Sequence, residues 1–213
     1  MSFLQNNLSL ITAIRRRLQA YRWEGKWCNE DGEFVWELNT HAPSIDRSVR
    51  SGWLVPGSHV LDIGCGLGFN AAWLAEENFK VLGVDISETA IAKARHLHKK
   101  RENVDFQALD VTADGKLQRH FDAIIDRGCL HGISPKLQPH YATNLISWLK
   151  PGGGALLMMA SFNKSTDDVT EHVKSLFGRQ MTVEHVEAIS MFERDDGETC
   201  SGLEFRLRKP GCE

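Results

Sequence analysis

The amino-acid sequence predicts an α/β fold in which a mostly parallel, seven-stranded sheet is doubly wound, with helices on both of its faces. Between residue 58 and about residue 178, short apolar strands alternate with helical patterns, which is typical of a parallel sheet with crossover helices. The first of these strands ends in a turn with three alternate glycines. After residue 180, two strand-like segments flank an acidic turn, which predicts an antiparallel pair at one edge of the sheet.

The alternation of strand-like and helical segments predicts the position of each element along the chain. Strands are predicted near residues 58–63, 79–84, 103–108, 120–126 and 153–160, and helices near 69–77, 87–100, 137–149 and 166–177. The Lys-Pro-Gly-Gly-Gly turn at 150–154 is the clearest break between a helix and the next strand. The antiparallel pair is predicted at 181–191 and 199–208, joined by the acidic turn at 193–197.

Residues 1–57 lie outside this alternation and predict an N-terminal helical extension and lid in front of an α/β domain at 58–213. Apolar residues recur at helical spacing in its first part: Leu4, Leu8, Ile11, Ile14 and Leu18. Four large aromatic residues then follow within a short segment: Trp23, Trp27, Phe34 and Trp36. These aromatics predict a cover over a site, and simple packing of the extension onto the domain is the equally favoured alternative.

Composition narrows the class of protein. A length of 213 residues with 25% charged residues indicates one elaborated globular domain. A net charge of −3 argues against a nucleic-acid partner, and the basic run at residues 15–17 is interpreted as a solvated helix face. Five cysteines without a C-x-x-C pair argue against a disulfide framework and against a metal site. Without a membrane-length apolar run or a signal-peptide pattern, we expect a cytoplasmic protein with no membrane partner.

The glycine-rich turn at residues 62–68 reads Asp-Ile-Gly-Cys-Gly-Leu-Gly and predicts a nucleotide-like cofactor site. Glycine lets a ligand approach the backbone, and the following helix offers free N–H groups to an acidic ligand group. A dinucleotide-binding turn, as in an NAD-dependent oxidoreductase, would place Gly or Ala where this chain has Phe69. The spacing instead resembles the D-x-G-x-G-x-G turn of class I S-adenosylmethionine (SAM) methyltransferases, which have a Rossmann-like fold. We therefore expect SAM to contact Asp62, Gly64, Cys65, Gly66 and Gly68.

Acids end the second and third predicted strands. A carboxylate such as Asp85 can bind both hydroxyls of a ribose, and capping of the helix that follows is the alternative. In class I methyltransferases an acid at the position of Asp110 accepts a hydrogen bond from the adenine amino group; an ordinary turn residue is the alternative. Asp62 is expected to face the methionine amino group of SAM, directly or through water, and a buried cap on the glycine turn is the alternative. Ile86 and Val111, which follow the two strand-end acids, complete this part of the predicted cofactor site.

The end of the fourth strand carries the most specific motif. Residues 126–135 read Asp-Arg-Gly-Cys-Leu-His-Gly-Ile-Ser-Pro and resemble the Asp-Arg-Gly segment of thiopurine S-methyltransferases and their bacterial relatives. The resemblance extends to Trp23, Lys26, Trp27, Phe34, Leu176-Phe177-Gly178 and Phe192-Glu193-Arg194. The chain departs from that family at its intact glycine turn, where the thiopurine enzymes have Pro-Leu-Cys-Gly-Lys, so thiopurine itself is not implied as the substrate. The Asp/Asn-Pro-Pro-Tyr/Phe loop of nucleic-acid amino-methyltransferases is missing after this strand.

The resemblance implies that residues 58–213 form a SAM-dependent methyltransferase domain acting on a small-molecule acceptor. Arg127 is expected to be a substrate-side cation. By the same analogy Arg194 is a second candidate, with a solvent-exposed turn arginine beside Asp195 and Asp196 as the alternative. His131 is a candidate general base, with a helix-entry histidine satisfied by the backbone as the alternative. The remaining residues expected to bind SAM, or its product S-adenosylhomocysteine, are Trp27, Phe34, Asp126 and Arg127. Cys129 is interpreted as a packing residue.

The acceptor is the open question at this level. A thiol or other soft nucleophile is favoured, and oxygen, nitrogen and metalloid (selenium or tellurium) acceptors are alternatives. A protein-substrate methyltransferase and a non-catalytic SAM-binding protein also stay open. The sequence leaves undecided whether the chain is a monomer or a dimer.

Overall fold

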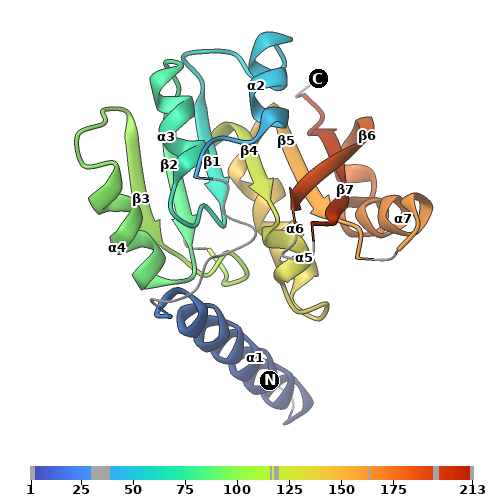
Figure 1. The fold of residues 1–213 in the computed structure, drawn as a ribbon. Coiled ribbons are helices and arrows are strands. Elements are labelled where there is room, and N and C mark those ends of the chain that lie inside the picture. Colours follow the sequence, from blue (N-terminus) through green and yellow to red (C-terminus); the bar gives the residue numbers. More distant parts are fainter. Residues whose placement is uncertain are drawn as a thin grey trace.

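A computed structural model describes residues 3–29, 39–115, 117, 120–162, 164–193 and 197–211, with the backbone alone for residues 3–8. Its centre is a seven-stranded sheet (Figure 1). The strands lie in the order β3 (Val104–Ala108), β2 (Lys80–Asp85), β1 (His59–Ile63), β4 (Phe121–Arg127), β5 (Leu149–Ala160), β7 (Thr199–Arg208) and β6 (Thr182–Glu193). The pairs among β1 to β5 are parallel, whereas β7 pairs antiparallel with both β5 and β6. The predicted fold class is therefore confirmed.

Four helices connect or follow strands where the sequence predicts them: α3 (Phe69–Glu76), α4 (Glu88–Leu97), α6 (Gln138–Trp148) and α7 (Thr166–Phe177). The N-terminal helix α1 spans Phe3–Trp27 and so includes the first two predicted aromatics. Two short helices, α2 (Pro43–Arg50) and α5 (Cys129–Gly132), and the 3₁₀ turn η1 (Gly178–Gln180) are not predicted from the sequence. Strand β5 begins at Leu149 instead of near residue 153.

Alternate residues of each central strand enter two separate cores, because successive side chains of a strand point to opposite faces. Leu61 of β1 and Ile124 of β4 pack on one face with residues of α5, α6 and α7. Val60 and Ile125 pack on the other face with residues of α2, α3 and α4. Helices therefore cover both faces of the sheet, as Figure 1 shows, and the carboxyl ends of the parallel strands are left for a site.

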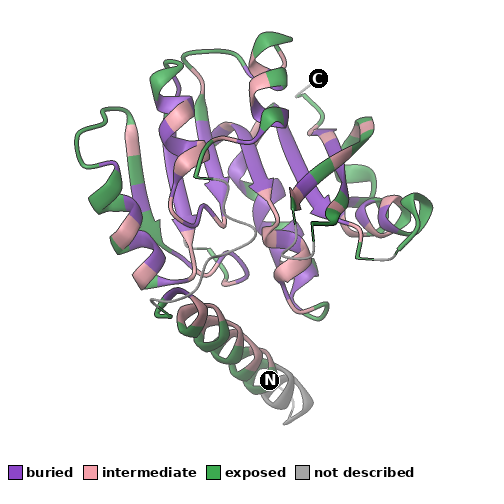
Figure 2. Cartoon of the chain, viewed as in Figure 1, coloured by how far each residue is buried: buried purple, intermediate pink, exposed green. Residues whose placement is uncertain are grey.

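Helix α1 contacts the domain through its C-terminal half. Glu24 accepts hydrogen bonds from the hydroxyls of Ser87 (2.6 Å) and Thr89 (2.5 Å) at the start of α4. Lys93 of α4 donates to the carbonyl oxygen of Trp27 at 2.8 Å, and Trp27 is only 3% exposed. The rest of α1 projects away from the sheet, with an exposed outer face (Figure 2). The carboxyl end of α1 is thus fixed over the carboxyl ends of the strands.

Candidate active site

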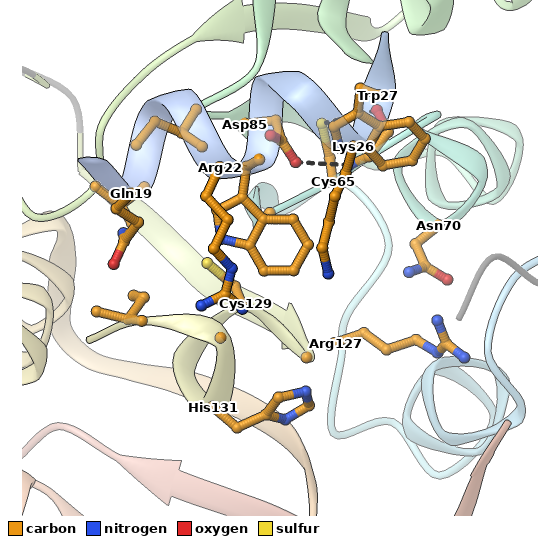
Figure 3. A pocket seen from close by; sticks show the side chains of 18 of the residues that line it. Gln19, Arg22, Lys26, Trp27, Cys65, Asn70, Asp85, Arg127, Cys129 and His131 are labelled. Carbon is orange, nitrogen blue, oxygen red and sulfur yellow. Dashed lines mark hydrogen bonds between the residues drawn. The ribbon is translucent and has the colours of Figure 1, made fainter. Parts of the chain in front are cut away.

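A cavity of about 400 Å³ lies at the carboxyl ends of the parallel strands, under the C-terminal half of α1 (Figure 3). The predicted cofactor residues that line it are Trp27, Gly64, Cys65, Gly66, Asp85, Ile86, Asp110, Val111 and Arg127. His131, predicted as catalytic, lines it as well. Three predicted cofactor residues are not among its lining residues: Asp62, Gly68 and Asp126. Phe34 and Arg194, like Trp36, lie outside the described residues.

The glycine turn forms the floor of the cavity between β1 and α3. Gly64 has φ +68°, and a Cβ there would lie 2.6 Å from the Cβ of Cys129, so a larger residue would displace α5. Gly68 is required for a different reason: a Cβ on it would overlap the ring of Phe106. Gly68 therefore serves packing between the turn and β3 in this structure, whereas Gly64 and Gly66 present backbone to the cavity.

Asp85 links the end of β2 to the glycine turn. Its carboxylate accepts hydrogen bonds from the backbone N–H groups of Gly66 (3.1 Å) and Ser87 (2.9 Å). Burial raises the pKa of Asp85, and these N–H groups oppose the rise. The cap of α4 is Ser87, whose side chain accepts from Ala90 N–H. Asp85 is thus free of the capping role that was its alternative, and its carboxylate lies at the cavity wall.

Asp110 lies at the end of β3 and also lines the cavity. One of its oxygens accepts from both the N–H (2.9 Å) and the hydroxyl (2.7 Å) of Thr112. These bonds are those of a turn residue, and they hold the carboxylate at the cavity edge. Two strand-end carboxylates can accept from hydroxyl and amino groups, and the apolar side chains of Ile86 and Val111 lie with them in the wall. This combination of hydrogen-bond acceptors and apolar side chains fits an adenosine.

Helix α5 is held by a fully buried carboxylate. Asp126 is 0% exposed and accepts from the N–H groups of Cys129 (2.7 Å) and Leu130 (3.0 Å) and from the Tyr141 hydroxyl (2.6 Å). Burial raises the pKa of Asp126 to about 6, against the opposing effect of these donors. Gln138 of α6 donates to the Leu130 carbonyl oxygen at 3.2 Å. The carboxylate of Asp126 faces α5 and α6 and positions the helix that carries His131. A contact between Asp126 and the cofactor stays a prediction.

His131 is fixed by a backbone contact that decides its tautomer. Its Nδ1 accepts a hydrogen bond from the N–H of Ala160 at 3.1 Å, so Nε2 carries the proton of the neutral ring. Burial, followed by the charge of Arg127, lowers the pKa of His131 to about 4. A neutral imidazole whose acceptor nitrogen is already engaged is a poor general base. The geometry favours His131 as a hydrogen-bond donor instead.

The low pKa of His131 predicts a pH-dependent stability. The histidine takes up a proton near pH 6.5 in the unfolded chain but only near pH 4 in the folded chain. The free energy of unfolding is therefore unaffected by this titration above pH 6.5, and it falls by roughly 3 kcal/mol between pH 6.5 and pH 4. His131→Asn keeps an acceptor for Ala160 but does not titrate. In urea unfolding at pH 7, 6, 5 and 4, the variant should therefore gain stability relative to the wild type as the pH falls.

The comparison with the wild type at each pH is needed because Asp126 acts in the opposite sense. Its folded pKa lies above the unfolded value, so its contribution to stability is lost as the pH rises through about 6. This contribution is common to both proteins and cancels in the difference. A difference between His131→Asn and the wild type that stays constant from pH 7 to pH 4 would contradict the assignment.

Cations surround the part of the cavity away from the two strand-end carboxylates. Arg127 lines it and donates to the carbonyl oxygen of Met191 in β6 at 2.6 Å. Arg22 and Lys26 extend from α1 towards the side where Arg127 and His131 lie (Figure 3). Burial and the neighbouring Arg22 lower the pKa of Lys26. This side of the cavity suits an anionic or electron-rich group.

Cys129 lines the cavity but is unsuited to act as a nucleophile. Burial, followed by the charge of Asp126, raises the pKa of its thiol well above the usual value. The thiol therefore stays protonated at neutral pH, and the thiolate is the reactive form. The interpretation of Cys129 as a packing residue agrees with this environment.

Helix α1 supplies five side chains to the cavity, and two of them, Gln19 and Arg22, were not singled out by the sequence. Gln19, Arg22, Trp23 and Lys26 line it together with Trp27. Their spacing of three and four residues places them along one face of a helix, which is the signal that could have identified them. Trp23 packs directly over Gly132, where a Cβ would lie 2.8 Å from the indole. Trp23 and Trp27 thus line the cavity from α1, and their role as a cover over a site stays a prediction.

No cluster of side chains suited to bind a metal ion occurs among the described residues. Within the same part of the chain, none of the helices combines the length and apolar character required to cross a membrane.

Comparison with known proteins agrees with this geometry. The family model for thiopurine S-methyltransferase matches residues 18–209. Over 159 residues the chain is 28% identical to a thiopurine S-methyltransferase of Legionella pneumophila, covering 68% of this chain and 71% of that protein. Over 87 residues it is 41% identical to an uncharacterised methyltransferase of Schizosaccharomyces pombe, covering 40% of this chain and 60% of that protein. The match thus spans about three-fifths of the length of this S. pombe relative.

A solved structure reported for the conversion of a disulfide bond into a thioacetal group during echinomycin biosynthesis aligns with a TM-score of 0.79. The alignment covers 91% of this chain and 94% of that one at 22% identity, and at this identity it shows the fold alone. The family match covers the whole sheet and every described cavity residue. The chain belongs to the thiopurine S-methyltransferase family of SAM-dependent methyltransferases.

Proposed function

We propose that this protein transfers a methyl group from SAM to a small-molecule acceptor, with a thiol or another soft nucleophile as the acceptor atom. The observation that carries the proposal is the division of one cavity into two chemically different sides. One side has glycine backbone and the carboxylates of Asp85 and Asp110, which suit an adenosine. The other side has Arg127 and His131, which suit an electron-rich acceptor.

When bound, SAM supplies a methyl group on a positively charged sulfur that leaves as a neutral thioether. A thiol acceptor would react as its thiolate after releasing its proton to solvent, and the methyl group would take the place of that proton on the acceptor sulfur. A small thiol is partly ionised near neutral pH, so the chain need not provide a strong base. The protein's task is to align the acceptor and exclude water, which can lower a barrier by several kcal/mol.

Each proposed role uses a contact that the structure shows. Arg127, held by the Met191 carbonyl oxygen, keeps a permanent charge beside the acceptor. His131, whose Nδ1 is occupied, offers Nε2–H to an anionic acceptor. Trp23 and Trp27 close the cavity from α1 and exclude water. We retain the binding of SAM by Trp27, Cys65, Ile86 and Val111, and the roles of Phe34 and Arg194, as proposals.

The size of the cavity supports a small acceptor over a nucleic acid or a protein, since about 400 Å³ must hold SAM as well. Oxygen, nitrogen and metalloid acceptors would meet the same cations and remain the alternatives within this proposal. A non-catalytic SAM-binding protein is the alternative outside it. A cytoplasmic location is part of the proposal.

The proposal is tested by methyl transfer from radiolabelled SAM to a panel of small thiols, phenols, amines, halides and selenium or tellurium oxyanions. SAM binding is measured in parallel by isothermal titration calorimetry. Turnover on thiols or chalcogen compounds is the expected result. Firm SAM binding without turnover on any class would favour the non-catalytic alternative, and absence of SAM binding would contradict the proposal as a whole.

Arg127 gives a residue-level prediction for the same assay. Arg127→Ala should lower kcat/KM for the best acceptor by about 100-fold, because a charge-assisted contact to the acceptor contributes roughly 1.5–3 kcal/mol. The affinity for S-adenosylhomocysteine should change much less. Arg179→Ala, at an exposed position in η1, is the matched control. Equal losses in turnover and in cofactor affinity would instead assign Arg127 to the cofactor.

A further inference from the structure

The outer face of α1 exposes a continuous row of large apolar side chains. Leu10, Ile11, Ile14, Leu18 and Tyr21, which we call the apolar stripe, are 60%, 45%, 48%, 63% and 82% exposed. Steps of three and four residues place them on one side of the helix. Figure 2 shows that this side faces away from the sheet along the projecting part of α1. A row of this kind on a soluble surface usually marks an interaction site.

Two of three consecutive arginines flank the apolar stripe, and the third does not. Arg16 points to the domain, where it donates to the Thr112 carbonyl oxygen and lies 3.6 Å from the carboxylate of Asp114. Helical spacing places Arg15 and Arg17 on either side of the stripe, and Arg17 is exposed. Of the three arginines, Arg16 therefore contacts the domain, whereas Arg15 and Arg17 lie along the two edges of the apolar stripe.

The charges near the apolar stripe and the composition of the remaining surface indicate which partner binds the stripe. The only acid in α1 is Glu24, and it is bound to Ser87 and Thr89, so two copies of α1 packed together would oppose arginine to arginine. The other exposed large apolar side chains in the described residues are Val55, Leu97 and Phe162, which lie on separate elements. The described surface therefore offers no extended apolar area that could receive α1 of a second copy. A membrane with anionic headgroups complements both the apolar stripe and its arginines.

We propose that α1 binds the surface of an anionic lipid bilayer. The apolar stripe lies at the boundary between headgroups and acyl chains, and Arg15 and Arg17 contact lipid phosphates. This is attachment in the plane of the membrane and revises the expectation of no membrane partner, which considered only a spanning segment. The proposal uses no cavity residue and does not depend on the proposed function. Since the same helix lines the cavity from Gln19 onwards, attachment would bring the cavity close to the lipid.

The test is cosedimentation of the full chain with vesicles of phosphatidylcholine alone or with phosphatidylserine added. The wild type should bind the anionic vesicles, and less so as salt is raised. Arg15→Gln/Arg17→Gln should lower the partition coefficient about 25-fold, because each arginine contributes roughly fivefold. Ile14→Ser/Leu18→Ser should lower it about 100-fold. Circular dichroism and urea unfolding verify that each variant is folded.

The matched controls are Leu97→Ser and Lys99→Gln/Lys100→Gln, which change exposed residues at the end of α4 and should bind vesicles like the wild type. Failure of the wild type to bind anionic vesicles, or equal binding to neutral ones, would overturn the proposal. So would a dimer in analytical ultracentrifugation that Ile14→Ser/Leu18→Ser dissociates, because it would assign the apolar stripe to a second copy.

Discussion

Replacing Asp126 with alanine is expected to destabilise the fold by about 3–5 kcal/mol, because a fully buried acceptor is removed from three donors. The Tyr141 hydroxyl and the N–H groups of Cys129 and Leu130 would then lose their partner, and α5 would lose its cap. Urea unfolding at pH 7 measures the loss. Because α5 carries His131, turnover should fall even at temperatures where the variant is folded.

Variants that remove different hydrogen bonds of Asp126 measure how much each bond contributes to the free energy of unfolding. Tyr141→Phe removes one donor and should cost about 1–2 kcal/mol. Asp126→Asn keeps one acceptor oxygen and should fall between Tyr141→Phe and Asp126→Ala. Asp167→Ala, in the exposed first turn of α7, is the matched control and should cost less than about 1 kcal/mol. A loss for Asp126→Ala as small as that of this control would contradict the role of Asp126 in holding α5.

The sheet could be predicted from the sequence because β1, β2, β4 and β5 each contain an apolar run, whereas β3 alternates apolar and polar residues. Turn residues bound these segments in the sequence. Helix α2 was not predicted from the sequence because its buried face includes Ser44 and Ser48. Buried serines do not contribute to a periodic pattern of apolar residues. Its position depends on distant partners: Arg47 pairs with the buried Glu204 of β7 at 3.0 Å, and Asn70 accepts from the Ala42 N–H at 2.9 Å. Contacts between residues so far apart in the chain leave no local signal.

The lining of the cavity was predictable where a charged residue ends a strand, as for Asp85, Asp110 and Arg127. It was not predictable where one motif position serves packing. Gly68 and Asp126 belong to the same motifs as residues that line the cavity, yet Gly68 makes room for Phe106 and Asp126 supports α5. A spacing pattern identifies the turn, but it does not separate residues that touch a ligand from residues that hold the turn in place. Separating these two kinds of residue requires the interatomic distances in the folded structure.

Replacing Asp85 with alanine is expected to weaken the binding of S-adenosylhomocysteine by about 10- to 100-fold, the value of charge-assisted hydrogen bonds to ribose hydroxyls. A second mechanism could also lower the affinity, because Asp85 accepts hydrogen bonds from the N–H groups of Gly66 and Ser87 and so stabilises the conformation of the glycine turn. Isothermal titration calorimetry measures the affinity, and urea unfolding of the free protein measures the effect on the turn. Asp105→Ala, an exposed acid on the neighbouring strand β3, is the matched control.

The two mechanisms are separated by ligands that lack a ribose hydroxyl. If the Asp85 carboxylate contacts the ribose, the 2′-deoxy or 3′-deoxy analogue of S-adenosylhomocysteine binds the wild type more weakly than the parent compound, while Asp85→Ala binds parent and analogues alike. If Asp85 acts only through the glycine turn, the variant weakens all of these ligands by the same factor and still discriminates against the analogues. The second result would remove the ribose contact from Asp85 and assign it a positioning role like that of Asp126. The first would fix the orientation of the cofactor, because a ribose held at the end of β2 directs the rest of the molecule along the glycine turn towards β4, where Arg127 lies.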